Sequence, residues 1–407
     1  MPKEYSPFTP GQPVPIEFFV GRAAEVARLK TALNEATSGR LRVAFLSGER
    51  GIGKSSLASL VRFLGERDDQ VLGLHTFLGG VTSLEEMVRR VLDRLLKESI
   101  GKTWHSKIRE FFGNRIREVG LFGVSVEFGV SEKDLTRLVH DFVPTLRRLV
   151  ERLKEEKKGI FLILDDINGL ASSEPFAHWL KSLVDEISTA RERLALCLVL
   201  VGLEERRQSL IGHQPSLARV FDVVDIRPWS EDETSSFFQN SFCAAGMQVE
   251  DVALRVLSMH AGGLPVLAHE IGDAAFRADK DDRIDESDAW AGVLTAADIV
   301  GRKHLEPQVF RAIRSPHYRA ILRRVGTAPF SMEFKRSDLR GGLSLGEAKV
   351  LDNFLTRMKK LGVVRPEPEE GPGYYRFVNR LHYLYMWMEA ERARKTGQLG
   401  HLVKSWL

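Results

Sequence analysis

The chain has 407 residues, of which 43% are hydrophobic and 28% charged, and its formal net charge is +4. That apolar content is ample for buried cores, and the length predicts two or three domains. No run of eighteen apolar residues occurs, and the charged, proline-containing start lacks a signal peptide's hydrophobic region. We therefore expect a cytoplasmic protein with no membrane segment, whose two cysteines, Cys197 and Cys243, are buried and unpaired.

The first elements lead up to a short apolar strand. Residues 1–17 are rich in proline and are predicted to form an extended N-terminal segment. The sequence FFVGR (18–22) then enters a predicted helix, AAEVARLKTALNEA. The next stretch, RVAFLS (42–47), is short, apolar and partly β-branched or aromatic, which predicts a buried strand.

A phosphate-binding loop follows this strand. Residues 48–55, GERGIGKS, match the pattern G-x-x-x-x-G-K-[ST] and run into a helical stretch, SSLASLVRFLGE. Glycines let the backbone turn tightly and point its N–H groups at phosphate oxygens, and the helix N-terminus adds partial positive charge. Lys54 is expected to reach the β- and γ-phosphates, and the Ser55 hydroxyl to hold Mg²⁺. The nucleotide contacts expected here are Gly48, Glu49, Arg50, Gly51, Ile52, Gly53, Lys54, Ser55 and Ser56.

The acidic partner of this loop is predicted at residues 159–167, GIFLILDDI. Asp165 is expected to bind Mg²⁺ through water, and Asp166 to polarise the water that attacks ATP. Two carboxylates at the end of a buried strand repel each other and are costly to desolvate. A bound metal ion would offset both energetic costs.

A long passage separates the two motifs, since Asp165 lies 111 positions after Lys54 (165 − 54). It begins with a predicted strand, VLGLHTFLGG (71–80), and a helix over 83–98. Residues 116–132 alternate apolar residues around glycines, which predicts a β-hairpin. One long helix is expected over 134–158. The hairpin is interpreted either as a simple insertion or as a finger presented to a partner.

Further strands and helices complete the predicted core, residues 18–228. LALCLVLVG (194–202) and VFDVVDIRPW (220–229) are predicted strands, and strands alternating with helices imply an α/β fold with a parallel, doubly wound sheet. Helical patterns then dominate residues 229–305, which we expect to form a helical lid. This segment is acidic: residues 229–301 hold 4 Lys and Arg against 14 Asp and Glu, a balance of −10.

The C-terminal part, residues 306–407, is predicted to be a winged-helix domain followed by a packing helix. Three helical patterns precede VVRPEPEEGPGYYRFVN, which predicts strand, turn and strand. Residues 302–407 hold 21 Lys and Arg against 10 Asp and Glu, a balance of +11, which favours an acidic partner such as duplex DNA or a protein surface. The third helix carries most of its polar residues beside an apolar stripe: Lys349, Asn353, Thr356, Arg357, Lys359 and Lys360.

With these motifs in view, the chain resembles the AAA+/STAND group of P-loop ATPases that carry a C-terminal winged helix, and the related origin-recognition-type initiators. The resemblance implies that Val20, Gly21 and Arg22 lie against adenine. It also aligns Gly263-Leu264-Pro265 with the lid motif, which implies an adenine contact for Pro265. Arg219 stands where an arginine finger from a neighbouring subunit is expected, although an ordinary surface arginine is the alternative.

Two departures from the group bear on its activity. The strand 194–202 leads into Glu204 in place of a γ-phosphate-sensing Asn or Thr, and the lid helix offers His269 where an arginine is usual. Both favour slow turnover, and we expect an ATPase that acts as an ATP- and Mg²⁺-dependent switch. A nucleotide-dependent homo-oligomer is a separate expectation. The alternatives are a DNA-binding initiator- or loader-type ATPase and an adaptor that binds ATP but scarcely hydrolyses it.

Overall fold

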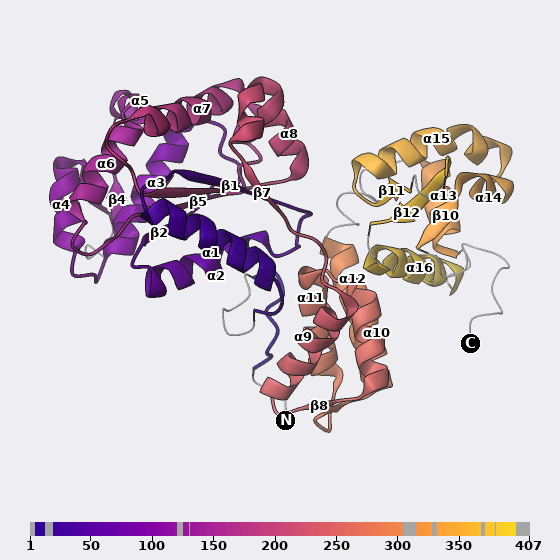
Figure 1. Ribbon diagram of the computed structural model, residues 1–407. Helices are drawn as coiled ribbons and strands as arrows, with labels where there is room; N and C mark the ends of the chain where they lie inside the picture. The colour runs from indigo at the N-terminus through magenta and orange to yellow at the C-terminus, as the bar shows by residue number, and fades with distance from the viewer. Residues whose placement is uncertain are drawn as a thin grey trace. The chain divides into compact units, whose positions relative to one another are not determined.

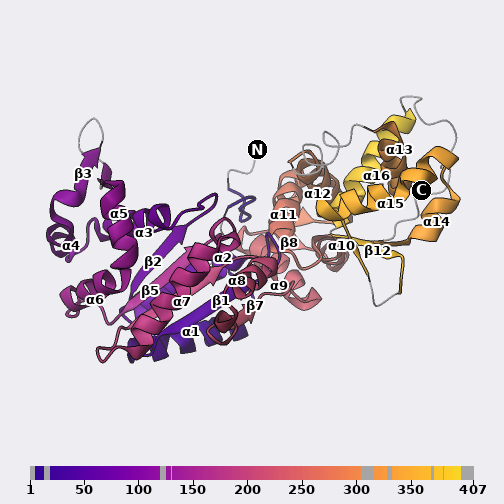
Figure 2. The same cartoon turned by 90° about the horizontal axis from the view of Figure 1, so that it is seen from above.

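The computed structural model describes residues 5–12, 19–119, 125–129, 131–303, 315–327, 332–367, 371–378 and 380–395. It divides into two compact units. One consists of Pro13–Arg227, and the other of Met1–Gln12 together with Pro228–Leu407. Figures 1 and 2 show the elements of both from two sides. In the part of the chain that is described, no helix has the length and apolarity needed to cross a membrane.

The unit Pro13–Arg227 is built on a parallel five-stranded sheet with strand order β2-β5-β6-β1-β7. The strands are β1 (Arg42–Ser47), β2 (Leu72–Phe77), β5 (Ile160–Asp165), β6 (Leu196–Val201) and β7 (Asp222–Asp225). All residues of β5 and β6 are buried, as expected of central strands covered on both faces. The predicted α/β fold with a parallel, doubly wound sheet is confirmed.

Helices cover both faces of this sheet. In Figure 1, α1 (Ala23–Thr37) and α2 (Lys54–Asp68) lie on one side, and α7 (Glu174–Thr189) and α8 (Glu204–His213) on the other. The first strand, β1, leads through the loop 48–53 into α2 and lies between β6 and β7. Strand order therefore reverses at the loop that follows β1, which is where ligands bind in sheets of this kind.

The passage between β2 and β5 differs from the prediction in two ways. The chain forms α3 (Leu84–Ser99), an unpredicted α4 (His105–Phe112), then strands β3 (Ile116–Val119) and β4 (Ser125–Phe128), which pair antiparallel as the expected hairpin. The single long helix expected over 134–158 is wrong, because α5 (Glu132–His140) ends before α6 (Phe142–Arg152) begins. Pro144 explains the break, since its ring lacks an N–H and would clash with the His140 carbonyl in a continuous helix.

The second unit begins with four helices, α9 to α12. They are α9 (Glu231–Ala244), α10 (Asp251–Ala261), α11 (Pro265–Ala278) and α12 (Glu286–Val300), with a short parallel pair formed by β8 (Gln248–Val249) and β9 (Arg283–Ile284). Capping boxes fix the starts of α9, at Ser230, and α12, at Asp285. Cys197 in β6 is buried as expected, but Cys243 is exposed, because it lies off the face of α9 that buries Phe238 and Phe242.

The C-terminal elements form a small mixed structure with its own apolar core. They are α13 (Pro316–Thr327), β10 (Glu333–Lys335), α14 (Arg336–Gly341), α15 (Leu345–Lys360), β11 (Val364–Pro366), β12 (Tyr374–Phe377) and α16 (Arg380–Lys395). The three strands pair antiparallel in the order β10-β12-β11, and β10 was not predicted. Helix α15 buries Leu351, Phe354, Leu355 and Met358. Its basic and polar positions, Lys349, Asn353, Thr356, Arg357, Lys359 and Lys360, are exposed.

The N-terminal segment packs on the helices α9 and α11 of its own unit. The Phe8 side chain is only 3% exposed, and its ring centroid lies 5.8 Å from that of Phe237 and 5.0 Å from that of Phe242. Gly272 of α11 leaves the space for it, because a Cβ there would lie 2.3 Å from the Phe8 ring. The Thr9 backbone N–H donates to His269 Nδ1 at 3.1 Å. Residues 5–12 are thus a docked strap, a feature that the proline-rich composition did not predict.

We expect acid to release this strap. Burial lowers the pKa of His269 to about 4, and only a neutral imidazole can accept the Thr9 N–H at Nδ1. Docking is therefore complete above the unfolded-state value near 6.5 and weakens as pH falls from there towards 4. At pH 5 the loss is at most about 2 kcal/mol, the value for an imidazole that undocking exposes completely. Amide hydrogen exchange of residues 5–12, corrected for intrinsic rates, should show less protection at pH 5 than at pH 7. Equal protection at both pH values would contradict the prediction, and Phe8→Ala should abolish protection at both.

Candidate nucleotide site

The loop between β1 and α2 adopts a conformation that requires glycine. Gly48, Gly51 and Gly53 have φ values of 150°, 77° and 93°, which side chains rarely tolerate. A Cβ on Gly48 would also lie 2.7 Å from the Ile226 carbonyl oxygen. The loop thus turns tightly and ends at the N-terminus of α2, where free N–H groups and the helix dipole favour a phosphate.

Lys54 connects this loop with the acidic end of β5. Its Nζ donates to the carbonyl oxygens of Gly48 and Glu49, each at 2.7 Å, so the side chain folds over the loop. Burial lowers the pKa of Lys54 to about 8, and the negative charges of Asp165 and Asp166 partly oppose that shift. The structure therefore brings together the lysine and the two carboxylates that the sequence motifs singled out.

The other predicted nucleotide contacts surround the loop. Arg22 is buried, and one of its guanidinium nitrogens donates to the Ile52 carbonyl at 3.3 Å. Gly21 and Arg22 have positive φ values of 72° and 65°, which turn the chain into α1. Val20 directly precedes this turn, and Phe18 lies outside the described residues. Glu49 and Arg50 are exposed at the loop tip, whereas Ser55 and Ser56 follow Lys54 in the first turn of α2.

Asp165 ends β5 as a buried carboxylate that is held by a histidine. Its side chain is 4% exposed, and its Oδ2 lies 2.7 Å from Nε2 of His75 in the neighbouring strand β2. His75 Nδ1 in turn lies 3.0 Å from the Ser59 hydroxyl of α2. The sequence analysis missed both residues, although a histidine inside the apolar strand LGLHTF was a signal that a buried polar partner was needed.

Asp166 follows in a different environment. It is exposed and has φ 57°, an uncommon conformation for a residue other than glycine. The Asn168 side-chain amide donates to Asp166 Oδ1, and Asn168 Oδ1 accepts the Leu203 backbone N–H at 3.3 Å. Asn168 therefore ties Asp166 to the end of β6. The chain holds this carboxylate in a strained turn, which occurs most often at functional sites.

The donor set at this site fits Mg²⁺. Mg²⁺ prefers hard oxygen ligands and is bound by one or two protein groups together with substrate phosphates and water. Ser55 supplies a hydroxyl, and Asp165 supplies a carboxylate. His75 contacts Oδ2 of this carboxylate, so Oδ1 is the oxygen that could bind the metal. Within the described residues no group of three or more His, Cys, Asp or Glu side chains could hold a metal by itself.

The two side chains considered as sensor replacements are both committed to other contacts. Glu204 accepts a hydrogen bond from the Ser47 hydroxyl at 3.0 Å and from Arg207 Nε at 2.9 Å, and the Arg207 contact lowers the pKa of Glu204 to about 2. An ionised carboxylate cannot donate to a phosphate, so Glu204 fixes α8 to the end of β1. His269 is 3% exposed and accepts from the docked strap.

Arg219 lies at the start of β7, away from the loop after β1. It ends the short 3₁₀ helix Pro215–Arg219, is exposed, and lines a shallow pocket of about 450 Å³ together with Arg28, Arg42 and Asp222. Arg28 pairs with Asp222 and Arg42 with Glu35, whereas Arg219 has no ion-pair partner among the described residues. Because β7 runs parallel to β1, this arginine lies at the opposite end of the sheet from Lys54.

Pro265 belongs to the second unit and is the first residue of α11. The preceding Gly263 has φ 74°, and its carbonyl accepts the Trp229 N–H at 2.9 Å. A Cβ at Gly263 would lie 2.3 Å from the Trp229 carbonyl oxygen, so glycine is required there. The Gly-Leu-Pro sequence therefore has a structural reason within its own unit, and an adenine contact by Pro265 remains a prediction.

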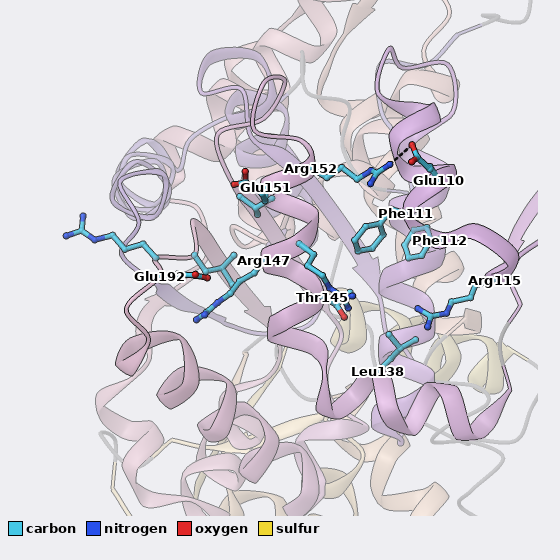
Figure 3. Close-up of a pocket in the computed structure, with 14 residues that line it drawn as sticks. Glu110, Phe111, Phe112, Arg115, Leu138, Thr145, Arg147, Glu151, Arg152 and Glu192 are labelled. Carbon is cyan, nitrogen blue, oxygen red and sulfur yellow. Dashed lines mark ion pairs between the residues drawn. The ribbon is translucent and has the colours of Figure 1, made fainter.

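A second, larger groove of about 820 Å³ lies on the helices α4 and α6 (Figure 3). None of the predicted site residues lines it. Arg152 pairs with Glu110 across it, and Phe111 and Phe112 stand beside that pair (Figure 3). Four of its arginines have no ion-pair partner among the described residues: Arg115, Arg147, Arg148 and Arg193. The groove is therefore a basic surface separate from the loop that carries Lys54.

Comparison with known families agrees with this geometry. Residues 19–199 match the family model of the AAA ATPase domain, a segment that contains the glycine loop, Lys54, Asp165 and Asp166. This stretch of the chain is thus similar to AAA ATPase domains, which supports nucleotide binding. No curated protein sequence matches the chain.

Solved structures resemble the chain over nearly its whole length at low identity. The Walker-type ATPase PABY2304 of Pyrococcus abyssi is 17% identical, with 91% of this chain and 96% of that chain covered and a TM-score of 0.54. The ORC2 protein of Aeropyrum pernix, in ADPNP–ADP complexes, is 16% identical, with 97% of each chain covered and a TM-score of 0.56. At these identities the similarity shows a shared fold alone.

Proposed function

We propose that this protein is a slow ATPase that works as a molecular switch. Lys54 and the loop glycines would bind the phosphates, Ser55 and Asp165 would hold Mg²⁺, and Asp166 would orient the attacking water. The observation that carries this proposal is the convergence of Lys54, Asp165 and Asp166, whose charges act on one another at the point where strand order reverses.

Slow turnover follows from the side chains around this centre. Donors aimed at the γ-phosphate speed hydrolysis because they stabilise charge that develops in the transition state. Glu204 offers only an acceptor, and His269 is buried under the strap. No sensor donor is therefore identified at either position, which favours a protein that dwells in its ATP-bound state.

The switch would act through the segments that follow the core. Residues 229–305 would form a lid that ATP·Mg²⁺ clamps and hydrolysis releases, and Pro265 would contact adenine from this lid. Residues 306–407 would form a winged helix whose presentation changes with the lid. In many such switches, a bound phosphate and its metal ion determine whether a segment is ordered and where it lies.

Binding of duplex DNA is the second candidate function, and the exposed face of α15 favours it. Lys349, Arg357, Lys359 and Lys360 are exposed there and have no ion-pair partner among the described residues. Unpaired cations along one helix are suited to phosphate contacts. Glu367 in the expected wing opposes this, although it lies 4.0 Å from Arg376, and the neighbouring Glu369 and Glu370 lie outside the described residues. A protein partner at this face is the competing outcome.

Steady-state ATP turnover, measured with and without duplex DNA, tests these functions together. Turnover that is slow and independent of DNA supports the switch, whereas stimulation by DNA supports the initiator or loader type. ATP binding without turnover leaves the adaptor. Fluorescence anisotropy over a salt series would then test α15, since phosphate contacts make affinity fall steeply with salt. Affinity unaffected by salt and by Arg357→Ala/Lys360→Ala would indicate protein docking.

Arg219 is expected to act on ATP bound by a neighbouring subunit. Arg219→Ala should keep ATP affinity and lower turnover about 10³-fold, because finger arginines stabilise the transition state. Mixing this variant with Asp166→Asn should restore part of the activity through one intact interface. Arg227→Ala is the matched control, since Arg227 is exposed but pairs with Asp225. Absence of rescue at every mixing ratio would indicate a switch that works as a monomer.

A further inference from the structure

We propose that His75 is a positioning residue that holds the Asp165 carboxylate in place for Mg²⁺, and that Ser59 holds His75 in turn. The inference rests on the proposed ATPase function and concerns residues to which the nucleotide motifs give no role. It begins with the chain of contacts from Ser59 of α2 through His75 of β2 to Asp165 of β5.

The hydrogen-bond directions in this chain follow from the groups themselves. An ionised carboxylate only accepts, so His75 Nε2–H donates to Asp165 Oδ2 over 2.7 Å. Nδ1 of a neutral imidazole is then an acceptor, and the Ser59 hydroxyl donates to it over 3.0 Å. Ser59 thereby selects the tautomer that Asp165 needs. This is the usual way in which an outer residue orients a metal-binding group.

Packing holds the imidazole in one orientation. The His75 side chain is 3% exposed, and its ring stacks on Phe77 with centroids 4.4 Å apart and planes 24° apart. His75 and Phe77 face the same side of β2, and Phe77 is directly opposite Asp165 in the parallel pairing. Asp165 Oδ2 is therefore fixed towards β2, which leaves Oδ1 as the oxygen that can meet a metal or its water.

The same contacts connect the two elements that carry the proposed Mg²⁺ ligands. Ser59 lies four residues after Ser55 and so on the same side of α2. The chain of contacts joins the helix that carries Ser55 to the strand that carries Asp165. Without His75, a carboxylate that is 4% exposed would have no hydrogen-bond donor among the described residues to hold its orientation.

The experiment measures Mg²⁺ binding without turnover. A fluorescent ADP analogue is bound to the full chain, and anisotropy is followed as Mg²⁺ is added and, separately, in excess EDTA. His75→Leu should raise the Mg²⁺ concentration for half-saturation about 10- to 100-fold while binding in EDTA stays unchanged. His75→Gln, which retains a donor near Nε2, should recover most of the loss, and Ser59→Ala should show a smaller shift.

Controls separate positioning from folding. Thr76→Val alters the next buried residue of β2, whose hydroxyl has no hydrogen-bond partner among the described residues, and should leave the Mg²⁺ dependence unchanged. In an Asp165→Ala background, His75→Leu should have no further effect. A folded His75→Leu with the parent's Mg²⁺ dependence would overturn the inference, as would equal weakening in EDTA. If His75→Leu does not fold, Ser59→Ala and His75→Gln decide the question. A parent protein that shows no Mg²⁺-dependent nucleotide binding would instead overturn the proposed function.

Discussion

Replacing Lys54 with alanine should abolish high-affinity binding of MgATP. In the proposed site Lys54 would contact the β- and γ-phosphates, and charged hydrogen bonds of this kind contribute about 1.5–3 kcal/mol each. Loss of two such contacts corresponds to an affinity lower by about 100-fold or more. Fluorescent ATP titration or calorimetry measures the change directly.

The structure also predicts that Lys54→Ala leaves the fold intact. Burial of the lysine lowers its pKa to about 8, so burial disfavours its charge. Among the described residues, two loop carbonyls accept its hydrogen bonds. Lys157 provides a matched control, because it is also partly buried and donates to a carbonyl, that of Val71, at 3.1 Å. Lys157→Ala should retain ATP affinity. Equal ATP affinity in Lys54→Ala and the parent would disprove the site.

The parts of the fold that sequence could predict are those determined locally. The loop at residues 48–55 could be predicted for two reasons. The positive φ values at Gly48, Gly51 and Gly53 require glycine, and the motif lies between a strand and a helix. The positions of the buried strands along the chain could be predicted because central strands of a parallel sheet are apolar throughout. The spacing of Asp165 and Asp166 at a strand end then indicated the acidic partner.

The break at Asp141 shows where periodicity alone is insufficient. The heptad-like apolar spacing of residues 134–158 continues across the break, and both α5 and α6 are strongly amphipathic. The deciding feature is Pro144, which is tolerated in the first turn of α6 but not inside one longer helix. Pro144, the third residue of α6, was therefore the signal in the sequence that a new helix starts shortly before it.

Contacts between distant segments that no sequence motif links could not be predicted. The Thr9–His269 hydrogen bond joins residues separated by 260 positions, and nothing in the proline-rich start specifies a cluster of aromatic side chains as its partner. The sequence also does not show that Gly272 makes room for the Phe8 ring, because a glycine within a helical pattern has many explanations. His75 is similar: its position in an apolar strand indicated a buried partner, but the choice of Asp165 depends on the register of β2 against β5.

The role proposed for Asp166 can be tested by measuring ATP binding and ATP hydrolysis separately. Asp166→Asn should retain MgATP affinity and lower the rate of hydrolysis about 10²- to 10⁴-fold, the usual contribution of a general base. Asparagine keeps the shape and tolerates the positive φ of 57° at this position, so the turn and its contact with Asn168 should persist. What would be lost is the negative charge that, in the proposed mechanism, polarises the attacking water.

Two measurements and one control make this test decisive. Single-turnover hydrolysis with the variant saturated by MgATP reports the chemical step, and nucleotide titration reports binding. Asp282→Asn is matched to it, because Asp282 is also exposed and has φ 64°, and it belongs to the other unit. That control should hydrolyse ATP at the parent's rate. Hydrolysis by Asp166→Asn at the parent's rate would exclude Asp166 as the base, whereas loss of ATP binding would mean that Asp166 supports the loop instead. Retained binding with lost hydrolysis would leave the protein held in its ATP-bound state, the form in which a partner of the switch should be sought.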